Sequence, residues 1–172
     1  TQRLHTLVKK LNPSMAVEPV VKQAGLFGED PAESGEGAKS SVAPESDFET
    51  IIVDNSEKLS GAIKELSAAK ILAFDTETTS TDPMNTALVG ISLAASPDKG
   101  FYVPVGHQTG TQLPLDEVIT ALRSLFTSPK IAKVGHNAKF DMVVLEQHGV
   151  SVTPLTFDTM IAEWLVNPDS RN

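Results

Sequence analysis

Apolar residues follow two different spacings from residue 47 to the end of the chain. Continuous apolar runs bounded by turn residues predict strands, and apolar residues three and four positions apart predict helices with one buried face. The predicted strands span residues 49–53, 71–77, 87–95, 100–105 and 131–135. The predicted helices span residues 56–69, 115–126, 138–148 and 157–166. Strands that first form a meander and then alternate with helices imply an α/β fold, with a mixed sheet flanked by helices.

The first 46 residues have a different pattern. Residues 1–12 place Leu4, Leu7, Val8 and Leu11 at helical spacing, which predicts a short amphipathic helix. Residues 13–46 are rich in Pro, Gly, Ser, Ala and Glu, and have almost no large apolar residues after Phe27. Such a segment cannot bury enough apolar surface to fold, so we interpret it as a flexible acidic linker. The folded domain is therefore expected to occupy residues 47–172.

Composition narrows the class of protein. The chain of 172 residues is 40% hydrophobic, enough for one domain and a tail, and it has no cysteine for disulfides or thiolate metal sites. No apolar run is long enough to span a membrane and no secretory signal is present, so we expect an intracellular protein without a membrane partner. The net charge of −8 argues against strong nucleic-acid binding by this segment alone. Acidic residues in the linker, and carboxylates that cations would neutralise, reduce that objection.

The first candidate site is a pair of carboxylates at the end of a predicted core strand. Asp75 and Glu77 follow the apolar run Ile71–Phe74 and are two residues apart, so both side chains project from the same face of the strand. Two like charges in this position repel each other, and a divalent cation would make the arrangement favourable. The alternative is a solvated strand end followed by a Thr/Ser-rich turn.

The second candidate site lies between residues 133 and 141. This segment predicts a short strand, a turn and the first turn of a helix, with Asn137 as the N-cap and Gly149 ending the helix. Asp141 then lies early in the helix, where it could contribute a carboxylate to the site. The helix dipole alone also accounts for an acidic residue in a first turn.

Together, the two segments resemble the first and second motifs of the DEDD superfamily of 3′–5′ exonucleases. The chain is similar to the proofreading exonuclease domain of the family A DNA polymerases, the bacterial DNA polymerase I family. The matching stretches occur in the family's order and spacing, and they span residues 74–78, 88–92, 102–105, 134–141 and 157–160. The resemblance implies a ribonuclease-H-like fold. The family's third motif, a Tyr and an Asp on a later helix, has no counterpart before Asn172, so we expect a fragment that is incomplete at its C-terminus.

The resemblance also implies a chemistry. Asp75, Glu77 and Asp141 would be the catalytic residues and would hold two Mg²⁺ or Mn²⁺ ions, with Asp75 bridging them. Hydrolysis would remove the terminal nucleotide from a single-stranded or frayed 3′ end of DNA during replication and repair. Thr78 and Asn137 would bind the substrate, although a helix-capping role is an equal alternative for Asn137. Thr81 stands where the best-known relatives carry a Leu that wedges against the terminal base.

The resemblance finally implies partners and a location. Residues 1–12 would end a preceding 5′-nuclease domain, although on composition alone their apolar stripe could equally cap the neighbouring domain. The polymerase domain would follow, and the parent protein would act in the bacterial cytoplasm, at the nucleoid. Because the third motif is lacking, we expect the isolated fragment to hold an incomplete metal site and to be nearly inactive.

Other residues and functions remain open from the sequence. We expect His136 to pack in its turn, Asp158 to cap the last helix rather than bind metal, and Trp164 to lie in the core. Lys130, Lys133 and Lys139 could meet phosphates or lie on a solvated face. The alternative functions are an RNA-trimming exonuclease of the same superfamily and an inert structural module of a polymerase.

Overall fold

The computed structural model describes residues 48–168. The helix predicted at residues 1–12 and the linker predicted at residues 13–46 lie outside the described residues. The strands are β1 (Glu49–Ile52), β2 (Ile71–Thr78), β3 (Leu88–Ala94), β4 (Lys99–Pro104), β5 (Ala132–Gly135) and β6 (Leu155–Asp158). The helices are α2 (Ser56–Leu66), α3 (Leu115–Thr127), α4 (Ala138–Gln147) and α5 (Thr159–Val166).

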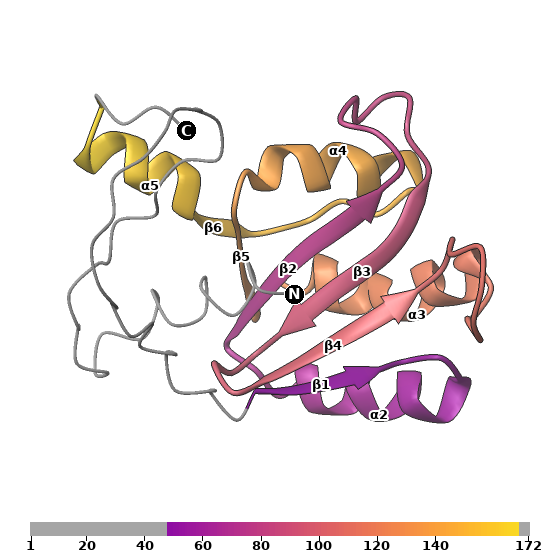
Figure 1. Cartoon of the computed structure of the whole chain (residues 1–172). Coiled ribbons are helices and arrows are strands. Elements are labelled where there is room, and N and C mark those ends of the chain that lie inside the picture. The colour runs from indigo at the N-terminus through magenta and orange to yellow at the C-terminus, as the bar shows by residue number, and fades with distance from the viewer. Residues whose placement is uncertain (1–47, 169–172) are drawn as a thin grey trace, which may run out of the picture.

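The strands form one mixed sheet, in the order β1-β4-β3-β2-β5-β6 (Figure 1). Strands β2, β3 and β4 form an antiparallel meander. Strand β1 pairs parallel with β4, β5 parallel with β2, and β6 parallel with β5. The predicted mixed sheet with flanking helices is therefore confirmed. Within residues 48–168, no helix is long and apolar enough to cross a membrane.

Strand β2 divides its side chains between the two faces of the sheet. Leu72 and Phe74 are fully buried and belong to the main core, which also contains residues of α2, α3 and α4. The Phe74 ring meets Phe126 of α3 edge to face, with ring centroids 5.5 Å apart. Ala73 instead joins a small cluster with Ala94 and Val134. Because side chains alternate along a strand, Thr76 continues the Phe74 face, whereas Asp75 and Glu77 continue the Ala73 face.

The C-terminal part of the chain corrects two sequence-based predictions. The helix predicted from residue 157 begins only at Thr159, because Leu155–Asp158 form strand β6 beside β5. Trp164, expected in the core, is 57% exposed. The physical reason is that α5 lies at the edge of the sheet beside β6, and among the described residues it buries only Thr159. Three further apolar side chains of α5 are exposed: Ile161, Leu165 and Val166.

Candidate active site at the end of strand β2

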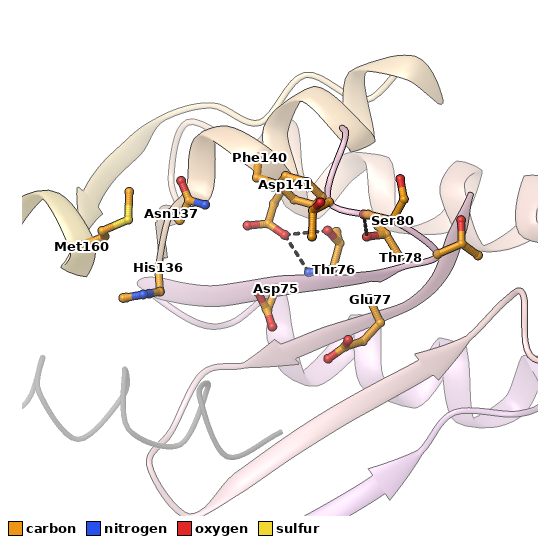
Figure 2. Close-up of a pocket in the computed structure, with 12 residues that line it drawn as sticks. Asp75, Thr76, Glu77, Thr78, Ser80, His136, Asn137, Phe140, Asp141 and Met160 are labelled. Atoms are coloured by element: carbon orange, nitrogen blue, oxygen red, sulfur yellow. Dashed lines mark hydrogen bonds between the residues drawn. The ribbon is translucent and has the colours of Figure 1, made fainter. Parts of the chain in front are cut away.

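A pocket of about 950 Å³ lies where β2 ends and α4 begins (Figure 2). Its wall is formed by the end of β2, the turn that follows, the β5–α4 turn and the start of α5. All sequence-predicted site residues line it: Asp75, Glu77, Thr78, Asn137 and Asp141. Thr81 lines it as well. Segments that are separated along the chain thus contribute to one concave polar surface.

Asp75 and Glu77 face the pocket from the same side of β2, as the strand alternation predicts (Figure 2). Asp75 is half-buried and Glu77 is exposed. Glu77 pairs across the sheet with Gly90, which has no side chain, and the ring of Tyr102 occupies the space above that glycine. A Cβ at Gly90 would lie only 2.0 Å from Tyr102 Oη.

The Tyr102 hydroxyl adds a polar group near Glu77 that sequence reasoning did not assign to the site. Its oxygen lies 2.6 Å from His107 Nε2. Burial raises the pKa of Tyr102, and the negative charge of Glu77 raises it further. Tyr102 therefore stays a neutral hydroxyl at the margin of the site. Its place within a matching stretch of sequence was the available signal, but the contact of its ring with Gly90, which pairs with Pro104 in the ladder, needs the three-dimensional structure.

Asp141 approaches the end of β2 from α4, on the opposite side from Asp75 and Glu77 (Figure 2). Its Oδ1 accepts hydrogen bonds from the Thr76 backbone N–H, at 2.8 Å, and from Thr76 Oγ1, at 2.5 Å. Asp141 is only 3% exposed. Burial raises its pKa to about 7; the charge of Asp75 also raises it, and the Thr76 hydrogen bonds oppose the shift. A carboxyl group with this pKa lacks a compensating positive charge.

The donor chemistry of the pocket fits a hard divalent cation. Within the part of the chain that the structure describes, no three His, Cys, Asp or Glu side chains already lie close enough together to hold a metal ion. The pocket nevertheless offers carboxylate oxygens from three positions, Asp75, Glu77 and Asp141. Carboxylate oxygens are the ligands that Mg²⁺ and Mn²⁺ prefer. A cation there would also supply the positive charge that Asp141 lacks.

The other residues in and beside the pocket differ in their local contacts. Thr78 Oγ1 donates to the Ser80 carbonyl oxygen at 2.9 Å and so shapes the turn after β2. His136 Nδ1 lies 2.9 Å from Thr159 Oγ1, which agrees with the expected packing in its turn. Asn137 occupies the N-cap position of α4, but its side chain makes no capping hydrogen bond. Asp158 caps α5, as predicted, by accepting from the N–H groups of Met160 and Ile161.

Lys133 corrects both sequence-based alternatives for that residue. It is neither a phosphate contact nor part of a solvated face, because the whole residue is buried. Its Nζ donates to the carbonyl oxygens of Ser128, at 2.6 Å, and Ile131, at 2.7 Å. Burial lowers the pKa of the Lys133 ammonium. Lys130 and Lys139 are exposed.

Comparison with known proteins shows which families the chain resembles. A family model described as 3′–5′ exonuclease matches residues 50–171. DNA polymerase I of Chloroflexus aurantiacus is 50% identical over 111 residues, which cover 64% of this chain and 12% of that protein. DNA polymerase I of Pseudomonas aeruginosa is 32% identical over 140 residues, which cover 78% of this chain and 15% of that protein. The chain thus spans only a small part of the length of these relatives.

Solved structures support the fold. RNase D of Escherichia coli, described as an exoribonuclease involved in structured RNA processing, superposes with a TM-score of 0.54. The match covers 73% of this chain and 31% of that chain, at 23% sequence identity. At this identity the likeness shows the shared fold alone, which is the ribonuclease-H-like architecture expected from the sequence.

Proposed function

We propose, from the premise that this chain belongs to the 3′–5′ exonuclease family found in bacterial DNA polymerase I, that it carries the proofreading site of such a polymerase. The reaction would be hydrolysis of the 3′-terminal phosphodiester bond of DNA, releasing a nucleoside monophosphate. The observation that carries the proposal is the lining of the pocket. It combines the carboxylates of Asp75, Glu77 and Asp141 with the polar side chains of Thr78 and Asn137.

The three carboxylates would bind the cations from two sides. Asp75 and Glu77 would bind from one face of β2, and Asp141 would bind from α4. Because Asp75 lines the pocket on the same strand face as Glu77 and its charge acts on Asp141, it is the residue we propose to serve both cations. Mg²⁺ or Mn²⁺, when bound, supplies an acidified water and neutralises charge on the phosphate.

The polar residues around the carboxylates would hold the substrate. The Asn137 amide can both donate and accept, so it suits the base or sugar of a terminal nucleotide. Thr78, which lines the pocket, would also contact the terminal nucleotide, and its bond to the Ser80 carbonyl oxygen fixes the turn beside it. Thr76 would hold Asp141 in place through the two hydrogen bonds to Oδ1.

Two alternative functions differ from this proposal in substrate or in activity. An RNA-trimming exonuclease would share the carboxylates and the fold, as RNase D shares the fold. The identity of 50% with a DNA polymerase I favours DNA as the substrate. An inert structural module is disfavoured because all three carboxylates are present and line one pocket.

The proposed setting is a larger polymerase. The relatives named DNA polymerase I are several times longer than this chain, so polymerase and 5′-nuclease domains are proposed as its covalent partners. A single-stranded or frayed 3′ end of DNA is the proposed substrate. The proposed location is the bacterial cytoplasm, in association with the nucleoid, because the substrate is chromosomal DNA.

The test is a gel assay with Mg²⁺ on 5′-labelled and 3′-labelled single-stranded DNA. It compares the polymerase that contains this chain with its Asp75→Ala and Glu57→Gln variants and with the 172-residue chain alone. We expect Asp75→Ala to lower the rate by on the order of a thousandfold or more, because charge stabilisation at both cations is lost. Glu57→Gln, an exposed carboxylate on α2, is the control and should leave the rate unchanged.

Two outcomes would change the assignment. Undiminished 3′ trimming by the Asp75→Ala variant would contradict the proposed mechanism. Faster trimming of RNA than of DNA would move the assignment to the RNA-trimming alternative.

A further inference from the structure

One carboxylate joins the β5–α4 turn to the start of α5. Asp158 is only 8% exposed, and its two oxygens accept hydrogen bonds from backbone N–H groups of both segments. In the turn, Asn137 N–H donates to Oδ1 at 3.1 Å and Ala138 N–H donates to Oδ2 at 2.8 Å. In α5, the N–H groups of Met160 and Ile161 donate to Oδ1 at 2.9 and 3.4 Å. A single buried side chain therefore satisfies donors at the N-termini of two helices.

The start of α4 depends on this carboxylate because its own N-cap side chain does not cap it. Asn137 adopts φ 57° and ψ 40°, the left-handed region, and is the one non-glycine residue with positive φ among residues 48–168. An Asn at the N-cap ordinarily lies in the extended region and accepts from an N–H of the first turn. Asn137 makes no such bond. Asp158 instead accepts from the N–H groups of Asn137 and Ala138, at the very start of α4, and the Asn137 amide side chain is not engaged as a helix cap.

Thr159, the residue after Asp158, strengthens the contact between the β5–α4 turn and the start of α5. The Thr159 hydroxyl lies 2.9 Å from His136 Nδ1 and donates to the Gly135 carbonyl oxygen at 3.5 Å. Gly135 pairs with Asp158 in the β5–β6 ladder. A Cβ at Gly135 would lie 2.7 Å from Ala138 Cβ, so the turn is tightly folded. Strand β6 and its junction with α5 thus hold the turn on several sides.

We propose that Asp158 is a positioning residue of the nuclease site, an inference that rests on the proposed function. By holding Asn137 in the left-handed conformation, Asp158 leaves its amide at the pocket wall for the terminal nucleotide (Figure 2). By fixing Ala138 at the first position of α4, it also sets where Asp141 meets Thr76. Asp158 is not a further metal ligand, because both of its oxygens accept backbone N–H bonds and it does not line the pocket.

The key variant is Asp158→Ser in the full 172-residue chain. A serine at this position can still cap α5, but it is too short to reach the turn. The first measurement is amide hydrogen exchange by NMR. We expect the Asn137 and Ala138 amides to lose protection while most amides of β2 and β3 keep theirs. Asp158→Asn, which conserves volume and keeps one oxygen, provides a second variant if the serine variant does not fold.

The second measurement is the affinity for thymidine 5′-monophosphate with Mg²⁺, a probe of the terminal nucleotide. We expect Asp158→Ser to weaken binding roughly three- to tenfold, the effect of one hydrogen bond lost at Asn137. Asn137→Ala should weaken it by a similar factor, and the double variant should be little weaker than either single variant. Asp116→Ser removes an exposed first-turn acid from α3 and should change nothing.

Each outcome decides the inference. Unchanged exchange at Asn137 and Ala138 in both Asp158 variants would overturn it, and so would additive effects of Asp158→Ser and Asn137→Ala on affinity. If the unmodified chain binds no nucleotide and its polymerase trims no DNA, the proposed function fails instead. The exchange measurement then still decides whether Asp158 holds the turn.

Discussion

At the scale of single residues, Asp141 combines burial with a nearby like charge. Its carboxyl is 3% exposed, and its pKa is raised to about 7 from an ordinary value of 3.8. The folded state therefore binds this proton more tightly than the unfolded state does. The resulting stabilisation is complete below about pH 4 and is lost as the pH rises through about 7. A cation that neutralised the site would remove this dependence.

The prediction is a fall in stability with rising pH when divalent cations are removed by a chelator. Between about pH 5 and about pH 8, the free energy of unfolding should decrease by on the order of 2–3 kcal/mol through Asp141. Urea titrations of the unmodified chain and of Asp141→Asn measure it, because the amide cannot titrate. If both proteins lose the same free energy across this range, Asp141 is not the titrating group.

Local spacing in the sequence was enough to select carboxylates that the structure places in one pocket. The Asp75–Glu77 pair and Asp141 were selected from two short segments, and the structure brings them to one pocket. Their catalytic and metal-binding roles stay predictions. The role of Asp158 toward Asn137 was not predictable, because its partner lies 21 residues away in the sequence and the contact needs the β5–β6 pairing. Lys133 was misjudged because lysines are almost never fully buried unless their charge is satisfied.

At the scale of elements, the close contact between β3 and β4 beside Glu77 depends on one glycine. Tyr102 of β4 lies across Gly90 of β3, so the absence of a side chain is required there. We expect Gly90→Ala to destabilise the protein by about 1–3 kcal/mol, the usual effect of overpacking. It should also displace the Tyr102 hydroxyl from His107. Thermal unfolding measures the stability, and ring proton shifts of Tyr102 report the displacement.

Two further variants make this prediction specific. Gly61 lies within α2, and a Cβ added there would have no neighbouring atom within 4 Å, so Gly61→Ala should instead stabilise the protein by up to about 1 kcal/mol. Combining Gly90→Ala with Tyr102→Ala should remove most of the clash. The prediction is wrong if Gly90→Ala is as stable as the unmodified protein and Tyr102 is still hydrogen-bonded to His107. In that case β3 and β4 can move apart to make room for the added methyl group.

Strand β6 shows why one element escaped sequence-based prediction. It has four residues, Leu155–Asp158, and lies at the edge of the sheet with Phe157 41% exposed. So short a segment shows too few alternations to be separated from the helix that follows it. The longer strands, with apolar runs buried on the main core, were placed within one or two residues. Strands β1 and β5 also have four residues but were predicted, whereas β6 runs directly into α5 at Thr159 with no turn residue between them.

At the scale of the whole molecule, the described residues leave an apolar helix face uncovered. Ile161, Trp164, Leu165 and Val166 of α5 are 54–86% exposed. We expect the fluorescence of Trp164, the single tryptophan of the chain, to have the emission of a solvated indole and to be quenched efficiently by acrylamide. Asn85→Ala, which changes a loop far from α5 in the sequence, is a control that should leave the quenching unchanged. A blue-shifted emission resistant to quenching would show that this face is covered in solution.

The hydrogen bonds between Asp141 and Thr76 join residues 65 positions apart in the chain. Loops of that length close late in folding, because their closure entropy is offset only after many other contacts have formed. During synthesis, β2 emerges long before α4, so Asp75 and Glu77 leave the ribosome well before Asp141 can meet the end of β2. A chain that has formed only the β2–β3–β4 meander would thus have three of the six strands of its sheet, with Asp75 and Glu77 in place, and would lack the contact that seats Asp141 at the end of β2.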